Sequence, residues 1–258
     1  MRQTSHFAKA RIDVFRGNYK PKGSEEKTFL LRRNLLAKSK DGHYTVYYAP
    51  LGEWLPKRSD RLILVGITPA LAHMEAADQV FRKTPAIKRK DEHAYSNVLR
   101  NEVAFIGDTG KNLCEMLDDI DLPRWLDAKR ASELFELTFK GVAMTSALFF
   151  PTFKDGKGLS GYPPCTRWAM FDDLLASHLI PRLHAAPKAL IIPLGAAAEK
   201  LVARAIHNSK ASDDRPIDTA RILSGFPHPS NQNRTRKQKL ARNRDALRGY
   251  VRSFLATR

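Results

Sequence analysis

Short runs of apolar residues alternate along this chain with stretches of helical periodicity. One run, residues 62–65, stops at Gly66, and another, residues 189–194, stops at Gly195. Sequence with the composition and spacing that favour a helix follows each glycine. The pattern therefore predicts two strand–turn–helix units, with helices over about 70–82 and 196–206.

Two further runs have the same character. Residues 142–145 are mostly apolar up to a break at Ser146, and residues 222–223 lead into a turn that contains His228. Short buried strands that alternate with helices are typical of a parallel sheet with helices on both faces and a ligand site at the carboxyl ends of the strands. We therefore expect the α/β class, as a three-layer α/β/α fold with a central, mainly parallel four-stranded sheet.

The first part of the chain is basic and only weakly patterned. Apolar residues at 29–31 and 35–36 suggest a short helix, and the β-branched and aromatic run 44–48 predicts a strand. No Gly/Ser-rich or Pro-rich linker separates two apolar halves, so one main domain with one core is expected. We assign residues 1–58 to a basic N-terminal extension packed on the core and residues 59–258 to that domain.

Composition narrows the class of partner. The net charge is +17 and the pI is near 10.0, which indicates a polyanionic partner. Nucleic acid is favoured over a membrane because the sequence has no long apolar span or basic amphipathic anchor. Cys114 and Cys165 are too few for a disulfide framework, and the N-terminus leads into no secretion-type apolar segment. We expect a cytoplasmic protein and a monomer.

The turn over residues 224–234 has the most distinctive local chemistry. Pro227 and Pro229 fix the backbone on either side of His228, so an imidazole that can donate a hydrogen bond is held at little entropic cost. A strongly basic segment follows, which can hold a phosphate backbone beside the ring. Taken alone, the same residues also suit a surface turn with a solvated histidine, and both interpretations stay open at this point.

Five separate segments together, in chain order, resemble the uracil-DNA glycosylase superfamily. They are residues 66–70 (GITPA), 105–110 (FIGDTG), 144–146 (MTS), 194–197 (LGAA) and 228–233 (HPSNQN). The first resembles the family's Gly-x-x-Pro turn, and the second resembles a Phe-x-Gly-x-x-Gly segment of its iron–sulfur-containing bacterial and archaeal branches. The last resembles the final His-Pro-Ser-x-x-Asn motif. The resemblance predicts the fold given above and a DNA partner.

The resemblance implies a role for each residue of the substrate pocket. A base in duplex DNA must rotate out of the stack before its glycosidic bond can be reached, at a cost of a few kcal/mol. Phe105 would stack on the flipped uracil, and Gly66 and Ile67 would lie beside it. His228 would donate to the uracil carbonyl as negative charge develops there. Thr68 would take the place of the residue that positions water.

The sequence departs from the family at several of these positions. Thr68 stands near where most branches carry an acid or amide, and a hydroxyl orients water but is a poor base. Ser146 replaces an Asn whose amide reads the uracil edge, which leaves specificity open. The related iron–sulfur branches use four cysteines, so we expect no cluster, no metal and no cofactor in a chain with two. Gln232 and Arg234 stand where some members insert a Leu into the base stack.

Each expected DNA contact has a structural alternative. Gly195 either closes a strand-to-helix turn or opens a phosphate site at a helix N-terminus. Ser230 either caps a local turn or donates to a phosphate. The basic run that includes Arg234 and Arg236 forms either a solvated helix face or a surface that tracks the DNA backbone.

The combined expectation is a monofunctional uracil-DNA glycosylase that flips uracil out of DNA and hydrolyses its N-glycosidic bond. Thr68 and Ser146 motivate an alternative from another class, a catalytically weak member that binds nucleic acid or damaged bases. A generic doubly wound phosphate- or nucleotide-binding enzyme is a third possibility, but the chain lacks a GxGxxG or Walker-type signature.

Overall fold

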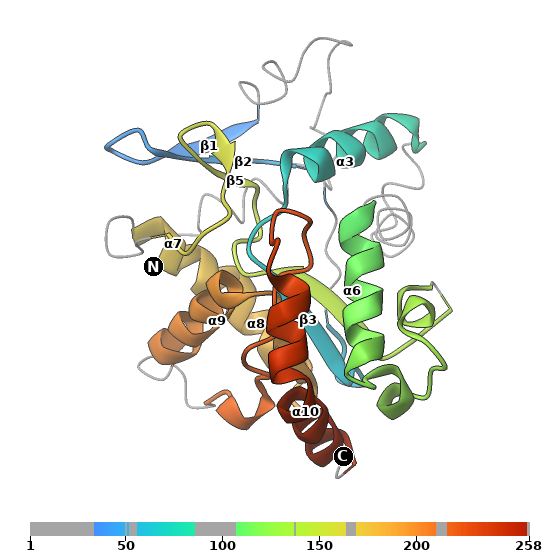
Figure 1. The fold of residues 1–258 in the computed structure, drawn as a ribbon. Coiled ribbons are helices and arrows are strands. Elements are labelled where there is room, and N and C mark those ends of the chain that lie inside the picture. Colours follow the sequence, from blue (N-terminus) through green and yellow to red (C-terminus); the bar gives the residue numbers. More distant parts are fainter. Residues whose placement is uncertain are drawn as a thin grey trace. The chain divides into compact units, whose positions relative to one another are not determined.

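The computed structural model describes residues 34–49, 51, 56–85, 107–136, 138–163, 169–209 and 216–256 (Figure 1). The chain divides into two compact units. The first comprises residues from the segments Met1–Glu53, Pro69–Ala104 and Phe150–Leu159, and the second comprises residues from Trp54–Thr68, Phe105–Phe149 and Ser160–Arg258. The expected boundary at residue 58 stays a prediction.

An antiparallel sheet in the order β1-β2-β5-β6 belongs to the first unit. Its strands are β1 (Leu35–Lys38), β2 (Tyr44–Tyr47), β5 (Thr152–Lys154) and β6 (Lys157–Gly158). The strand expected over 44–48 is confirmed. The short helix expected from the apolar residues at 29–31 and 35–36 is wrong at 35–36, and residues 29–31 lie outside the described residues. Gly42, with a φ of 78°, closes a tight turn that returns the chain, so β1, including Leu35, pairs with β2.

The helix α3 (Leu71–Lys83) also belongs to the first unit and confirms the helix predicted after the first glycine. Met74, Ala77 and Phe81 recur at helical spacing and are buried. The helix ends where Thr84 turns its hydroxyl back to the carbonyl of Val80 at 2.7 Å.

A parallel three-stranded sheet in the order β4-β3-β7 forms the centre of the second unit. Its strands are β3 (Leu62–Gly66), β4 (Val142–Ser146) and β7 (Leu190–Pro193). The first four residues of β3 and all of β7 are buried, as expected for a sheet covered on both faces. The mixed α/β class and the three strands predicted from apolar runs are thus confirmed.

The expected four-stranded sheet is not found among the described residues. Ile222 makes a single parallel bridge to Ile191, and the amide of Leu223 donates to the Ile191 carbonyl at 2.8 Å. The pairing stops there because Gly225, with a φ of 80°, turns the chain, and Pro227 has no amide proton to continue a ladder.

Helices pack against both the sheet and one another in the second unit. The longer ones are α6 (Asp108–Asp119), α9 (Ala196–Ser209) and α10 (Arg236–Leu255), and the shorter ones are α7 (Ala169–Leu174) and α8 (Ile180–Ala185). Short helical turns cover η1 (Pro123–Leu126), η2 (Ala131–Phe135), η4 (Leu175–Leu179) and η5 (Thr219–Arg221). The helix predicted over 196–206 is confirmed by α9.

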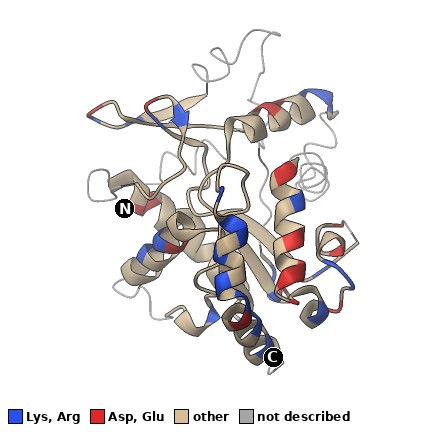
Figure 2. Cartoon of the chain, viewed as in Figure 1, with Lys and Arg blue, Asp and Glu red and all other residues tan. Residues whose placement is uncertain are grey.

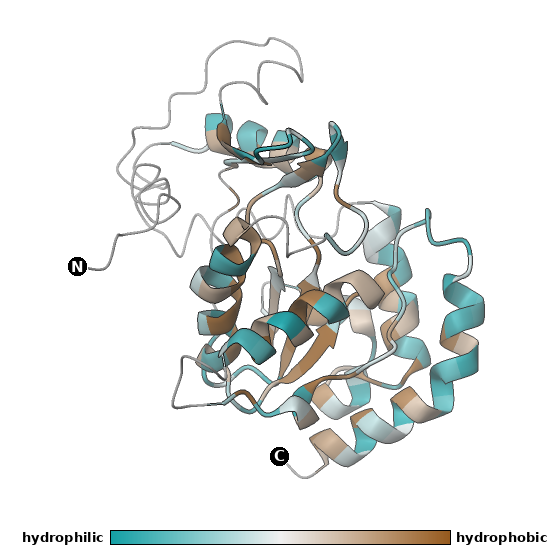
Figure 3. Cartoon of the chain, turned by 90° about the vertical axis from the view of Figure 1, so that its left-hand side faces the viewer, coloured by the Kyte–Doolittle hydropathy of each residue, from teal (hydrophilic) through white to brown (hydrophobic). Residues whose placement is uncertain are grey.

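One apolar cluster joins the sheet to α6 and α10. Leu62 and Leu190 of the sheet share this cluster with Leu117 of α6 and with Leu247 and Val251 of α10. The strands are brown (hydrophobic) in Figure 3, whereas α10, which ends near the C-terminus, begins hydrophilic and becomes more apolar. No helix within the described ranges has the length and apolar character needed to cross a membrane.

Candidate functional site

The ends of β3 and β4 bring together residues that are far apart in sequence. Gly66 is paired in register with Ser146, and a Cβ atom at Gly66 would lie 3.7 Å from the Ser146 hydroxyl. Pairing continues beyond the strands, because the amide of Leu148 donates to the Ile67 carbonyl at 2.9 Å. Ser146 is partly exposed, whereas the Ile67 side chain is buried. This edge therefore presents a hydroxyl beside a backbone that has no side chain in the way.

Gly195 brings the end of β7 against the histidine turn. It has a φ of 88°, and a Cβ atom there would lie only 2.8 Å from the Cβ of His228 and 3.1 Å from its backbone nitrogen. Its amide donates to the Phe226 carbonyl at 3.0 Å, and its carbonyl accepts from Glu199 as α9 begins. Gly195 thus closes the strand-to-helix turn and permits close approach of His228. Any contact with phosphate falls to the following first-turn amides, which have no partner within a helix.

A hydrogen bond from the backbone favours one tautomer of the His228 ring. The backbone amide of Ser230 donates to Nδ1 at 3.2 Å, so Nδ1 acts as acceptor and a neutral ring carries its proton on Nε2. Burial lowers the pKa of His228 below its usual value. The side-chain amide of Asn233 donates to the His228 carbonyl at 3.0 Å and fixes the backbone of the turn. The result is a neutral imidazole with an N–H donor at Nε2.

A polar network from α6 holds the rest of the turn. Asn112, which is 8% exposed, donates to the Pro229 carbonyl and to the Asn231 side-chain oxygen, both at 2.9 Å. Asn231 in turn donates to Asp108 at 2.7 Å, and Arg236 donates to the Asn112 side-chain oxygen at 2.9 Å. The roles of Asp108 and Asn112 on α6 were not predicted from the sequence. Their signal is an Asp and an Asn at i, i+4 spacing near the start of an amphipathic helix.

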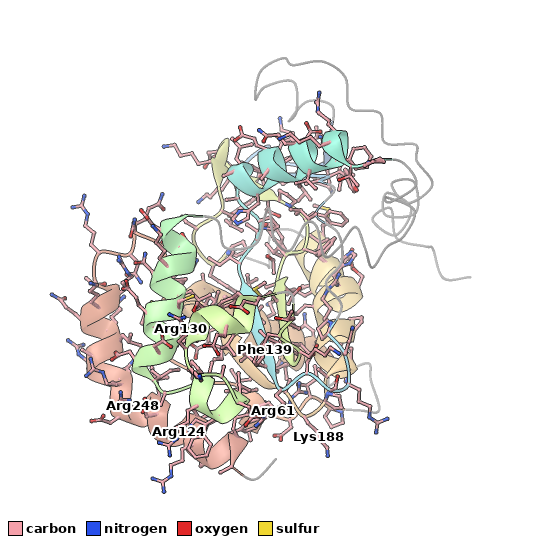
Figure 4. All side chains as sticks on the ribbon, turned by 90° about the vertical axis from the view of Figure 1, so that its right-hand side faces the viewer. Arg61, Arg124, Arg130, Phe139, Lys188 and Arg248 are labelled. Carbon is pink, nitrogen blue, oxygen red and sulfur yellow. The ribbon has the colours of Figure 1, made fainter. Side chains whose placement is uncertain are left out.

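Basic residues of α10 are divided between two sides of the helix. On the side that faces α6, Arg244 donates to the Asp119 carboxylate at 2.9 Å, and Arg248 donates to the Asp119 carbonyl at 2.8 Å. Arg248 also lies 3.2 Å from Asp121, and it is labelled in Figure 4 on α10 beside α6. Figure 2 shows acidic α6 next to basic α10. These arginines tie two helices together, and Arg236 does so through Asn112.

The remaining basic residues near the turn are exposed to solvent. Arg234, Lys237, Lys239 and Arg242 are exposed, as is Gln232. The four cations are called the outward set: Arg234 precedes α10, and the other three lie on it. The structure thus separates Arg234, which is open to solvent, from the partly buried Arg236.

Three predicted residues have less direct support. Thr68 is partly exposed just beyond β3. Phe105 lies outside the described residues, so its stacking role stays a prediction. Ser230 uses its backbone amide on His228, which leaves the two alternatives for its partly exposed hydroxyl open.

Cys114 on α6 does not have the properties of a reactive thiol. Burial, with a smaller effect of Asp118, raises its pKa to about 11, so it is protonated at neutral pH. Among the residues that the structure describes, no group of three His, Cys, Asp or Glu side chains could hold a metal ion.

The comparisons with known proteins add a relative but no activity. No family model matches the chain. The chain is 29% identical over 213 residues to the uncharacterized protein YoxB of Bacillus subtilis (strain 168). The aligned residues cover 82% of this chain and 80% of the relative. Because that name states no activity, function must be inferred from the site itself.

Proposed function

We propose that this protein is a uracil-DNA glycosylase, which flips uracil out of DNA and hydrolyses its N-glycosidic bond as the first step of base excision repair. The observation that carries the proposal is the fixed, neutral ring of His228, whose Nδ1 accepts from Ser230. A ring held in this state offers its Nε2 proton to an anion. The ordered motifs that resemble the glycosylase superfamily support the same function.

The reaction requires stabilisation of negative charge on the leaving base. As the bond between the sugar carbon and the uracil nitrogen lengthens, the sugar becomes oxocarbenium-like and the uracil becomes an anion. His228 donates from Nε2 to a uracil carbonyl oxygen and binds this anion more strongly than the neutral base. Water then adds to the sugar carbon, and the proton that it loses passes through solvent to the uracil anion, which gives neutral free uracil and an abasic site.

The strand ends supply the rest of the pocket in this proposal. Gly66 lets the base approach the backbone, Ser146 hydrogen bonds to its edge, and the buried Ile67 supports the β3 end. Phe105 stacks on the base. Thr68 orients the water without acting as a strong base, so charge stabilisation by His228 provides most of the catalysis.

DNA contacts are assigned to the outward set and the two turns. Arg234 and its exposed neighbours on α10 bind phosphates of the backbone, and Gln232 fills the space that the flipped base vacates. The first turn of α9 after Gly195 and the Ser230 hydroxyl bind the phosphates next to the flipped nucleotide. Arg236 contributes a cation on the inner edge of the same surface.

The finer fold assignment belongs to the same proposal. A three-layer α/β/α arrangement with residues 222–223 as an edge strand of a four-stranded sheet is supported by the burial of β3 and β7 and by the bridge at Ile222. The carboxyl ends of such strands form one edge, where His228, Gly195, Gly66 and Ser146 are expected to line the site.

The direct test is cleavage at a single uracil. Purified protein is incubated with a labelled oligonucleotide that contains one uracil, either single-stranded or paired, and alkali then cuts the strand at any abasic site. Cleavage at that position, and none in a matched oligonucleotide with thymine, is the expected result. Absence of cleavage on both forms, with DNA binding retained, would overturn the proposed activity.

A catalytically weak DNA-binding or damaged-base-binding protein is the second candidate. It is favoured by Thr68, which cannot deprotonate water efficiently, and by Ser146, which has fewer hydrogen-bonding atoms than an amide. The outward set of cations suits both candidates. A retained preference for uracil-containing DNA in a binding assay, without turnover, would identify this second function.

A further inference from the structure

Asn112 uses its side-chain amide fully and lies at the centre of the network. Its two N–H groups donate to Pro229 and Asn231, and its oxygen accepts from Arg236, with all three distances at 2.9 Å. A buried amide with every group satisfied has one orientation. This residue is therefore able to fix the geometry of the groups around it.

The contact with Pro229 reaches the catalytic ring through a single peptide unit. The Pro229 carbonyl that accepts from Asn112 and the Ser230 amide that donates to His228 Nδ1 belong to the same planar peptide group. Rotation of that peptide moves both hydrogen bonds at once. Asn112 therefore controls the donor that determines which nitrogen of His228 carries the proton.

Arg236 determines which way the Asn112 amide faces. A guanidinium has only donors, so the amide oxygen must point toward Arg236 and the N–H groups must point toward the turn. The reverse orientation would place oxygen against the Pro229 carbonyl. The positive charge also polarises the chain of hydrogen bonds in the direction of His228.

We infer that Asn112, oriented by Arg236, is a positioning residue that holds His228 in its Nε2-protonated tautomer through the Pro229–Ser230 peptide. This inference rests on the proposed function for its effect on turnover. Its effect on the ring itself does not depend on any activity. Neither Asn112 nor Arg236 needs to touch the substrate for this role.

Two variants and one matched control test the inference. Asn112→Leu keeps the branched arrangement of four side-chain heavy atoms and removes all three hydrogen bonds, and Arg236→Met removes the group that orients the amide at a partly exposed position. Arg248→Met is the control, since it makes the same change on the same helix and also breaks a contact with α6. All three are made in the full chain.

The readouts separate positioning from folding. Ring ¹⁵N chemical shifts report the tautomer of His228, single-turnover rates and Kd values are measured with the uracil oligonucleotide, and thermal melting reports stability. We expect Asn112→Leu to give a mixture of His228 tautomers and a loss of about 10- to 100-fold in rate at unchanged Kd. Arg236→Met should shift the tautomer and the rate in the same direction. Arg248→Met should lower the melting temperature alone.

The outcomes distinguish this inference from the proposed function. Wild-type tautomer and rate in both Asn112→Leu and Arg236→Met would overturn the positioning role. If Arg248→Met shifted the His228 tautomer and lowered the rate as much as the other two variants, the positioning role would also be overturned. The effect would then come from a general loosening of α10. If wild-type protein does not act on uracil, the proposed activity fails while the tautomer measurement still decides the role of Asn112.

Discussion

The two sides of α10 carry the same kind of residue but make different contacts. On the inward side, Arg236 and Arg244 are bound to groups of α6 at 2.9 Å. On the outward side, Lys239 and Arg242 are exposed. The helical repeat of 3.6 residues turns Lys239 and Arg242 away from the stripe that carries Arg244 and Arg248. A basic run in sequence is thus two sets of residues, one that builds the site and one that faces solvent.

This difference separates the expected contributions to turnover and to affinity. Changes on the inward side act through the His228 turn, because Arg236 reaches it through Asn112. Changes on the outward side remove charges that attract the phosphate backbone and leave the turn intact. The predictions below test whether the two sides behave so differently.

His228→Ala should have the largest effect and should fall entirely on turnover. Loss of one donor to a developing anion lowers catalytic rates by about 10²–10³-fold, so a comparable fall in the rate of uracil excision is expected. The Kd for uracil-containing DNA should change little because the outward set is untouched. Single-turnover kinetics and fluorescence anisotropy measure the two quantities, and a parallel weakening of binding would contradict the separation.

Gly195→Ala should have the next largest effect, on both rate and stability. The new Cβ would lie 2.8 Å from the His228 Cβ, and the φ of 88° costs an alanine about 1–2 kcal/mol. The turn must move to relieve the contact, so we expect a lower melting temperature and a loss of about 10- to 100-fold in rate. Gly249→Ala, on α10 where an added Cβ meets nothing within 4 Å, is the control. An unchanged rate in Gly195→Ala would show that the turn tolerates displacement.

Much of the second unit could be predicted from the apolar runs and from the residues that end them. The strands β3, β4 and β7 and the helix α9 follow from short buried runs that end at glycine or at a polar residue. The expected fourth strand is not confirmed, because the two residues before a Gly and Pro turn form only one bridge. The expected N-terminal helix failed because pairing with β2, a tertiary contact, overrode local leucine content.

The residues that hold the candidate site were harder to predict. Asn112 lies more than a hundred positions from its partners in the turn, and nothing in its local sequence marks it as their partner. The hydrogen bond from Ser230 to His228 is local but depends on the orientation of one peptide group. The division of the basic run was implicit in the helical period, but the inward side could be assigned only once α6 was placed against it.

Removal of outward cations should have a smaller effect than the two substitutions above, and the effect should fall on the affinity for DNA. Lys239→Gln and Arg242→Gln should each weaken DNA binding and reduce the magnitude of the slope of log K against log salt by about one unit. The rate at saturating protein should stay at the wild-type value. Arg248→Met is the inward counterpart and should leave the salt slope unchanged, since its guanidinium is already bound to Asp119. Equal slopes in all three variants would remove the distinction between the two sides of α10.

Acidification should have the smallest effect on the rate and on stability, because His228 stays neutral until the pH falls below about 6.5. Burial lowers its pKa below the usual 6.5, so the folded state binds this proton less readily than the unfolded chain. The stability that His228 contributes is therefore fully present above about pH 6.5 and is lost as the pH falls through the folded pKa. Protonation of Nδ1 also breaks the hydrogen bond from Ser230, so the rate should fall in the same window.

A pH–rate profile and an NMR titration, assigned with His228→Ala, should give one matching midpoint below 6.5. A midpoint above 6.5 would mean that the ring works as a cation, and the Ser230 contact would then not be what prepares it for catalysis.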